Sequence, residues 1–132
     1  MFRRILTTFA LAAVAAAGAV VAQPHHGGSN DTPCFFINQW RGWKAPNDHT
    51  LYLGVNFHDV YEVQLAGSSP MLQDPDAHIV SITRGPPTVC NPVDLQLSID
   101  EPYGVHEPLI ATSLVKLTPE QVKAIPPKYR PY

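Results

Sequence analysis

The chain has 132 residues, of which 45% are hydrophobic and 15% are charged, and its formal net charge is −2. Beyond residue 22 the basic residues are scattered, whereas proteins that bind nucleic acid or an anionic membrane surface cluster their Lys and Arg side chains. We therefore expect neither of these partners. All 14 prolines also lie beyond residue 22, between the apolar segments, which favours short strands joined by turns over long helices.

Residues 1–22 have the features of a secretory signal peptide. Two arginines, Arg3 and Arg4, precede an Ala-rich apolar run that ends in small residues before Gln23. The run is short and gives way at once to polar residues, so we expect cleavage after Ala22 rather than a transmembrane anchor. The mature chain would be periplasmic or secreted, with 110 residues, a net charge of −4 and enough length for one domain.

From Cys34 onward the sequence has the pattern of short strands. The alternation is clearest between Val93 and Ile99, where every odd residue is apolar and every even residue is polar. Two similar segments lie on either side of a turn signal, which predicts a hairpin of residues 50–55 and 60–65. Further strands are predicted at residues 34–40, 77–83 and 109–117.

A short helix is predicted after the last strand. Thr118 suits the N-cap, Pro119 suits the first helical position, and Gln121 can reach back to the cap. Because Pro126 and Pro127 prevent its continuation, the helix should end at about Ala124.

These elements predict one mainly β domain. Six short strands, without regular alternation of strands and long helices, indicate a small antiparallel barrel or sandwich with a short C-terminal helix. We expect this domain to span residues 34–125. Residues 23–33 have hardly an apolar side chain and predict a disordered lead-in, and residues 126–132 predict an extended tail.

The two cysteines, Cys34 and Cys90, are expected to form a disulfide, because an exported chain meets an oxidising compartment. A bond that closes so long a loop stabilises the fold by about 4 kcal/mol in the chain-entropy model. A redox-active pair is the weaker interpretation, since the Cys-x-x-Cys spacing of such sites is missing.

The histidines give no metal site. His25 and His26 lie near the expected new N-terminus, but Pro24 lacks the amide proton that a square-planar copper site would need to lose. Looser metal binding by this histidine-containing segment stays an alternative. The remaining histidines are spread over separate segments, so we assign no metal ligand and no cofactor.

No catalytic residue is assigned from the sequence. Asp94 is the first carboxylate to consider, but a hydrogen bond to loop backbone explains it better than catalysis, because no partner acid or base is placed beside it. Ser68 and Ser69 lack the Gly-x-Ser-x-Gly setting of a hydrolase nucleophile. A small hydrolase or metal-dependent enzyme that uses Asp94 and a histidine is therefore only an alternative.

Four aromatic residues are candidates for a recognition surface. Side chains with an apolar body and a polar edge are enriched at interfaces and stack on sugars or peptides. In so small a domain the same residues can instead fill the core, which we favour. Together with Asp94, the candidate binding residues are Trp40, Trp43, Tyr52 and Tyr61.

Several short motifs follow one another between residues 34 and 115: Cys34-x-x-Ile37, Asp48-x-Thr50-Leu51, Val60-Tyr61, Leu65, Pro70-x-Leu72 and Cys90-x-x-x-Asp94. In this order they resemble a family of small exported bacterial domains that carries only a domain-of-unknown-function label. Members of that family often have two further cysteines, near the positions of Ser69 and Ile110, and this chain lacks both. The resemblance therefore implies a bond between Cys34 and Cys90, and it implies no activity.

The sequence thus predicts an exported, non-catalytic module of the cell envelope. Its partner would be an envelope protein or a small ligand, which the sequence does not identify. An enzymatic role is disfavoured but open, because distant histidines and carboxylates can converge in a fold.

Overall fold

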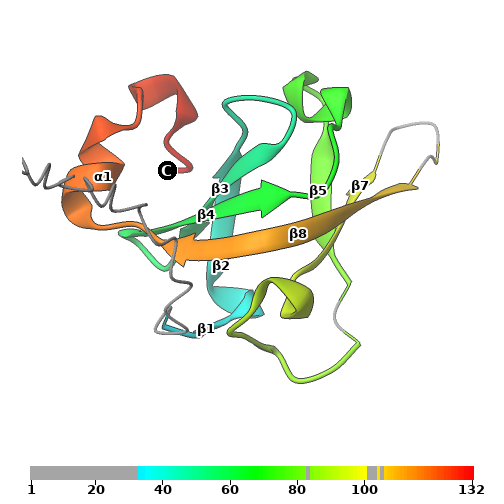
Figure 1. The fold of residues 1–132 in the computed structure, drawn as a ribbon, viewed down its shortest axis with the longest axis horizontal. Helices are drawn as coiled ribbons and strands as arrows, with labels where there is room; N and C mark the ends of the chain where they lie inside the picture. Colours follow the sequence, from blue (N-terminus) through cyan, green and yellow to red (C-terminus); the bar gives the residue numbers. More distant parts are fainter. Residues whose placement is uncertain (1–32, 83, 101–103, 105) are drawn as a thin grey trace, which may run out of the picture.

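The computed structural model describes residues 33–82, 84–100, 104 and 106–132. The signal peptide predicted at residues 1–22, and all of the predicted lead-in except Pro33, lie outside the described residues. The described part has eight strands in two antiparallel sheets and one short α-helix (Figure 1). This confirms the prediction of a mainly β fold with a short C-terminal helix.

The larger sheet has six strands in the order β2-β3-β4-β8-β7-β5 and curls around the core (Figure 1). Its central strand, β8, has 11 residues and pairs with β4 through its second part and with β7 through its first. The strands are β2 (Trp40–Lys44), β3 (Thr50–Val55), β4 (Asp59–Leu65), β5 (His78–Ser81), β7 (Gln96–Asp100) and β8 (His106–Lys116).

The second sheet is small and packs on one side of this core. It consists of β1 (Phe35–Phe36) and β6 (Thr88–Val89), which pair antiparallel. Phe35 and Val89 are both buried and belong to the same apolar cluster as the inner side chains of the six-stranded sheet. The two sheets therefore share one core.

The hairpin predicted at residues 50–55 and 60–65 is confirmed as β3 and β4. In this pair Leu51 lies opposite Val63 and Leu53 lies opposite Tyr61, and all four side chains are buried. Directly opposed residues of antiparallel strands share a face, so the predicted alternation places them together in the core.

Two predicted strands are shorter than expected because a side chain closes a turn within each of them. In the first, Gln39 Oε1 accepts a hydrogen bond from the Phe36 backbone N–H at 2.8 Å, and the 3₁₀ turn η1 (Ile37–Gln39) separates β1 from β2. In the second, the 3₁₀ turn η3 (Pro92–Asp94) precedes β7. Asp94 therefore lies in a turn and not on the polar face of a strand.

The helix α1 (Pro119–Ala124) begins as predicted. Thr118 Oγ1 accepts a hydrogen bond from the Gln121 backbone N–H at 3.3 Å, and Gln121 Oε1 accepts one from the Thr118 N–H at 2.8 Å. These reciprocal bonds satisfy amide groups that the start of a helix leaves without partners. Among the described residues, no helix is long and apolar enough to cross a membrane.

The C-terminal segment, expected to be an extended tail, forms the 3₁₀ turn η4 (Pro127–Tyr129) and then packs on the sheet. Gly42 of β2 lies opposite Gly54 of β3, and Pro131 lies against both glycines. A Cβ atom on Gly42 would come within 2.9 Å of the Pro131 carbonyl oxygen. The paired glycines therefore allow the chain to approach the outer face of the sheet closely.

Candidate functional site

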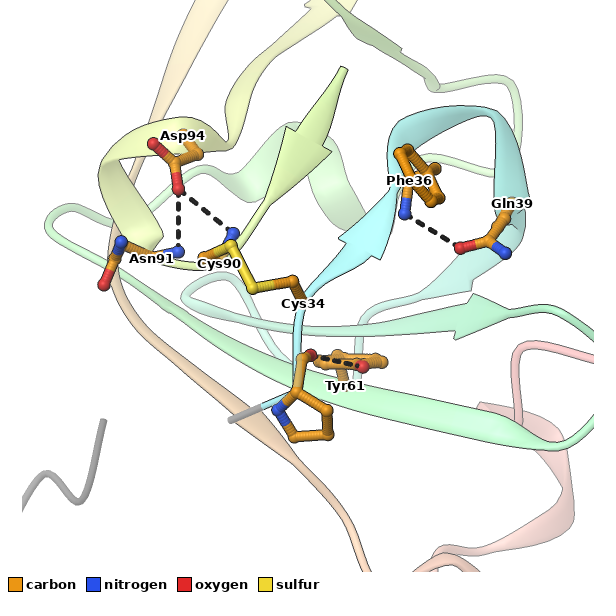
Figure 2. The surroundings of a disulfide bond; sticks show 8 residues. Cys34, Phe36, Gln39, Tyr61, Cys90, Asn91 and Asp94 are labelled. Carbon is orange, nitrogen blue, oxygen red and sulfur yellow. Dashed lines mark hydrogen bonds between the residues drawn. A yellow bond between two sulfur atoms is a disulfide. The ribbon is translucent and has the colours of Figure 1, made fainter. Parts of the chain in front are cut away.

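The predicted disulfide between Cys34 and Cys90 is present, across a sequence separation of 56. Figure 2 shows it beside Asp94, whose Oδ2 accepts hydrogen bonds from the backbone N–H groups of Cys90 at 3.0 Å and Asn91 at 2.9 Å. These two bonds lower the pKa of Asp94, because they stabilise the carboxylate form. Asp94 thus holds the loop that carries Cys90.

No described histidine contacts Asp94 through a hydrogen bond or an ion pair. The carboxylate already accepts two backbone donors, and its side chain lies at the surface. An acid–base pair built on Asp94 and a histidine therefore has no geometric support in the described part of the chain.

A different carboxylate contacts both a serine and a histidine. Asp48 Oδ1 lies 2.8 Å from His49 Nδ1, and the Ser68 hydroxyl donates to Asp48 Oδ2. The Ser68 bond, followed by the His49 bond, lowers the pKa of Asp48. In a Ser-His-Asp nucleophile the histidine lies between the serine and the acid, whereas here the carboxylate lies between them. The cluster joins two loops and has no activated nucleophile.

The sequence candidates Tyr61 and Trp40 are structural. Tyr61 is 2% exposed, and its ring lies 4.7 Å from that of Phe35. Its hydroxyl donates to the Pro33 carbonyl at 2.8 Å, the bond drawn at Tyr61 in Figure 2. Trp40 packs against the core and donates its Nε1–H to the Gly42 carbonyl at 2.7 Å. The indole N–H of Trp40 and the hydroxyl of Tyr61 therefore both donate to backbone carbonyls within the fold, so neither donor is free to bind a ligand.

Tyr52 lies apart from the other aromatic candidates. It occupies the middle of β3 between the core residues Leu51 and Leu53, so it points to the opposite face of the sheet. Partial burial, followed by the nearby Glu62 carboxylate, raises the pKa of its hydroxyl. The four aromatic candidates therefore do not form one surface.

Trp43 lines a polar pocket of about 390 Å³, which we call the Trp43 pocket. Three segments meet there: the end of β2, the end of the 3₁₀ turn η2 (Pro70–Gln73) with the stretch that leads to β5, and η4 near the C-terminus. Ala45 and Leu72 are among the lining residues, and the aromatic and polar ones are Trp43, Lys44, Gln73, Asp74, Lys128 and Tyr129.

The Trp43 pocket combines aromatic surface with free polar groups. Trp43 Nε1–H donates to none of the described residues, in contrast to Trp40 Nε1–H. Gln73 Nε2 donates a hydrogen bond to the Ala45 carbonyl at 3.4 Å, and the Gln73 side-chain oxygen is left available as an acceptor. Lys128 Nζ lies 4.6 Å from the Tyr129 ring centroid, so a cation and an aromatic ring line the pocket together.

Sequence reasoning found Trp43 but missed its partners in this pocket. Gln73 and Asp74 lie in a turn region, and Lys128 and Tyr129 lie in the segment that was expected to be an extended tail. No local pattern places residues 128–129 beside residue 43. That proximity depends on the C-terminal segment folding back over the sheet.

A small pocket lies between the segment after β4 and the first part of β8. Ser69 and Ile110 both line this pocket, which has a volume of about 120 Å³. Ser69 is 2% exposed, and its Oγ has no hydrogen-bond partner among the described residues. An unpartnered buried hydroxyl costs stability, so a water molecule in this pocket would stabilise the site.

Within the described ranges, no group of three or more His, Cys, Asp or Glu side chains could hold a metal ion. His25 and His26 lie outside those ranges, so metal binding by this segment stays a prediction. Comparisons with protein-family models, with curated proteins and with solved structures find no match to this chain.

Proposed function

We propose that the chain is an exported, non-catalytic binding module of the bacterial cell envelope and that the Trp43 pocket is its ligand site. The signal-peptide pattern of residues 1–22 supports export, and the Cys34–Cys90 disulfide fits an oxidising compartment. The observation that carries the binding role is the meeting of three segments around Trp43, whose Nε1–H has no partner among the described residues.

The lining of the Trp43 pocket favours a sugar ring with an anionic substituent. The indole of Trp43 can stack on the apolar face of a pyranose while its Nε1–H donates to a ring hydroxyl. Lys44 and Lys128 give the rim an excess of positive charge over Asp74, which suits a carboxylate or a phosphate on the sugar. Gln73 and Asp74 supply acceptors for hydroxyl groups.

The hydrolase alternative has weaker support from the same geometry. Asp94 is committed to backbone donors beside the disulfide, and the Asp48 carboxylate separates Ser68 from His49. The Trp43 pocket itself contains a single carboxylate, Asp74, whereas glycoside hydrolysis usually requires a pair. We therefore assign binding without catalysis.

Calorimetric titration of mature protein with uronic-acid oligosaccharides tests this proposal, with neutral oligosaccharides of the same length as the comparison. We expect the acidic sugars to bind more tightly and Trp43→Ala to weaken binding by at least about tenfold, as the loss of one stacked aromatic ring predicts. Because Trp43 also packs against the core, second variants are Tyr129→Ala, at a residue that does not belong to the core cluster, and Lys44→Glu, at an exposed residue.

The matched controls are an exposed aromatic residue and an exposed cation outside the pocket. Phe57 is 74% exposed and Arg41 lies above its ring, so Phe57→Ala and Arg41→Glu should leave sugar binding unchanged. Equal losses in the pocket variants and in these controls would contradict the assignment of the site. Failure of every oligosaccharide to bind would remove sugars as the ligand class.

A further inference from the structure

A second concave site lies away from the Trp43 pocket and shares no lining residue with it. It is a groove of about 360 Å³ between η3, β7 and β8, which we call the Ile110 groove. Three large apolar side chains that line it are well exposed: Ile82 at 43%, Val93 at 78% and Ile110 at 66%. Its volume is in the ordinary range for ligand pockets, about 300–1,000 Å³.

The exposed apolar side chains are concentrated at this groove because of the strand register. Ile110 of β8 lies opposite Gln96 of β7, and the Ile82 backbone N–H donates to the Gln96 carbonyl at 2.8 Å. Ile82 and Ile110 are therefore on the same face, two strands apart, and η3 adds Val93 beside them. A contiguous apolar patch of this kind marks an interaction site more often than scattered apolar residues do.

The lining of the Ile110 groove carries a positive charge. Arg84 is exposed and is the only charged residue among the described residues that line it. It forms no ion pair with any acidic residue in the described part of the chain. An occupant that matches the groove therefore has an apolar body and a negative charge at one end.

The backbone around the groove distinguishes a hydrocarbon chain from a peptide. β7 pairs with β5 on one side and with β8 on the other, and the Ile110 carbonyl accepts from the Ala66 N–H at 2.9 Å. These interior strands have few backbone groups left for a bound segment. An extended peptide would need partners for its own N–H and C=O groups, whereas a hydrocarbon chain needs none.

We propose that the Ile110 groove binds the hydrocarbon chain of a single-chain amphiphile whose anionic head group pairs with Arg84. A long-chain carboxylate is the simplest molecule with this chemistry. The apolar body would cover Ile82, Val93 and Ile110, and the carboxylate would accept hydrogen bonds from the Arg84 guanidinium. This site is independent of the proposed sugar-binding function.

Titration calorimetry of mature protein with dodecanoate, below its micellar concentration, tests the proposal. We expect saturable binding of one dodecanoate per chain, weakened by at least about tenfold in Arg84→Glu, as the loss of a charge-assisted pair predicts. Ile110→Ser should also weaken binding, and it should preserve the fold because the side chain is exposed. Dodecanol, which has the same chain without the charge, should bind more weakly and be insensitive to Arg84→Glu.

Two matched variants separate the groove from general effects of charge and surface. Arg41→Glu changes the net charge by the same amount as Arg84→Glu, and Val115→Ser removes another exposed apolar side chain of β8. Neither variant should alter dodecanoate binding, and Trp43→Ala should also retain it. Retention in Trp43→Ala makes failure of this proposal distinguishable from failure of the proposed function.

Three outcomes would overturn the proposal. The first is the absence of saturable dodecanoate binding, and the second is an equal loss of binding in Arg84→Glu and Arg41→Glu. The third is a concentration-dependent dimer in analytical ultracentrifugation that Ile110→Ser abolishes and dodecanoate does not affect. That result would identify a second copy of the chain, rather than an amphiphile, as the occupant.

Discussion

The two halves of the six-stranded sheet differ in what lies on their outer faces. Over β2 and β3 the C-terminal segment packs closely, and Val60 of the neighbouring strand β4, the register partner of Gly54, is 0% exposed. In the half formed by β5, β7 and the start of β8, outer-face side chains such as Ile110 stay exposed. We call these the covered half and the open half.

The difference follows from one pair of residues. In the covered half Gly42 and Gly54 lie opposite each other, and Pro131 packs against both. In the open half the outer face instead carries the large side chains of Ile82, Gln96 and Ile110. Glycine has no Cβ atom, so another segment of backbone can approach the strand closely there. Large side chains at the same place prevent that approach. The covered half therefore binds its own chain, while the open half keeps an apolar surface free for an external molecule.

Loss of the disulfide should have the largest effect, because it joins the segment that leads into β2 of the covered half to the one that leads into β7 of the open half. We expect Cys34→Ser combined with Cys90→Ser to lower the free energy of unfolding by about 4 kcal/mol. Urea denaturation measures this change. A loss near zero would mean that the two halves hold together without the bond.

Gly42→Ala should have the next largest effect and should act on the covered half. The added Cβ would lie 2.9 Å from the Pro131 carbonyl oxygen, so the C-terminal segment must move or detach. We expect a loss of about 1–3 kcal/mol, as for overpacking. Gly67→Ala is the control, because its Cβ would meet nothing within 4 Å. Equal stability of both variants in thermal unfolding would argue against close packing of the segment.

Acidification should lower the free energy of unfolding by a smaller amount, through one carboxylate in each half. The pKa values of Asp48 and Asp94 are lowered from their ordinary value of 3.8 by the hydrogen bonds that each carboxylate accepts. A depressed carboxylate pKa stabilises the fold above the ordinary value, and this contribution disappears as the pH falls through the folded-state pKa. Stability should therefore fall below about pH 4.

The variants that test this pH dependence are Asp48→Asn and Asp94→Asn. Each keeps the side-chain shape but loses the charge, so the decrease in unfolding free energy between neutral and acidic pH should be smaller than in the unmodified protein. Asp76→Asn is a suitable control, since it removes the same kind of charge from an exposed carboxylate that accepts no hydrogen bond from the described residues. An unchanged acid profile in both variants would contradict a role for these two carboxylates.

Ile110→Ser should have the smallest effect on stability, which makes it the sharpest contrast with Gly42→Ala. The side chain is 66% exposed, so we expect a change within about 0.5 kcal/mol in the absence of ligand. Val60→Ala, a truncation in the covered half, removes two methyl groups from a fully buried side chain and should cost clearly more. Similar losses in urea denaturation for the two variants would remove the distinction between the halves.

Much of the fold could be predicted because the signals that specify it are local. Alternation predicts β3 and β4, and the sequence Thr-Pro-Glu-Gln predicts the start of α1. The short strand β6 and the separate strand β2 were not predicted, because β1 and β6 have only two residues each and the Gln39 side chain ends β1 early. Such interruptions depend on the direction of single side chains, which the alternation of a segment does not encode.

The candidate sites could be predicted only in part. Trp43 was a candidate because its residue type suits recognition, but Tyr61, chosen for the same reason, fills the core and bonds Pro33. Residue type does not distinguish these two roles. Both rings lie opposite Leu53 and therefore on the same face of the sheet, but Tyr61 is on the interior strand β4 and Trp43 is on the edge strand β2. The order of the strands, which depends on pairing between distant segments, decides how deeply each ring is buried.

The sequence by itself determined the mainly β class, the hairpin, the cap of the helix and the pairing of the only two cysteines, since each depends on neighbouring residues or on compartment chemistry. Only the tertiary structure decided that residues 128–131 return to β2, that Asp94 holds the Cys90 loop, and that Arg84 and Ile110 line one groove. These contacts join segments far apart along the chain, where register and backbone approach, rather than local propensity, set the geometry.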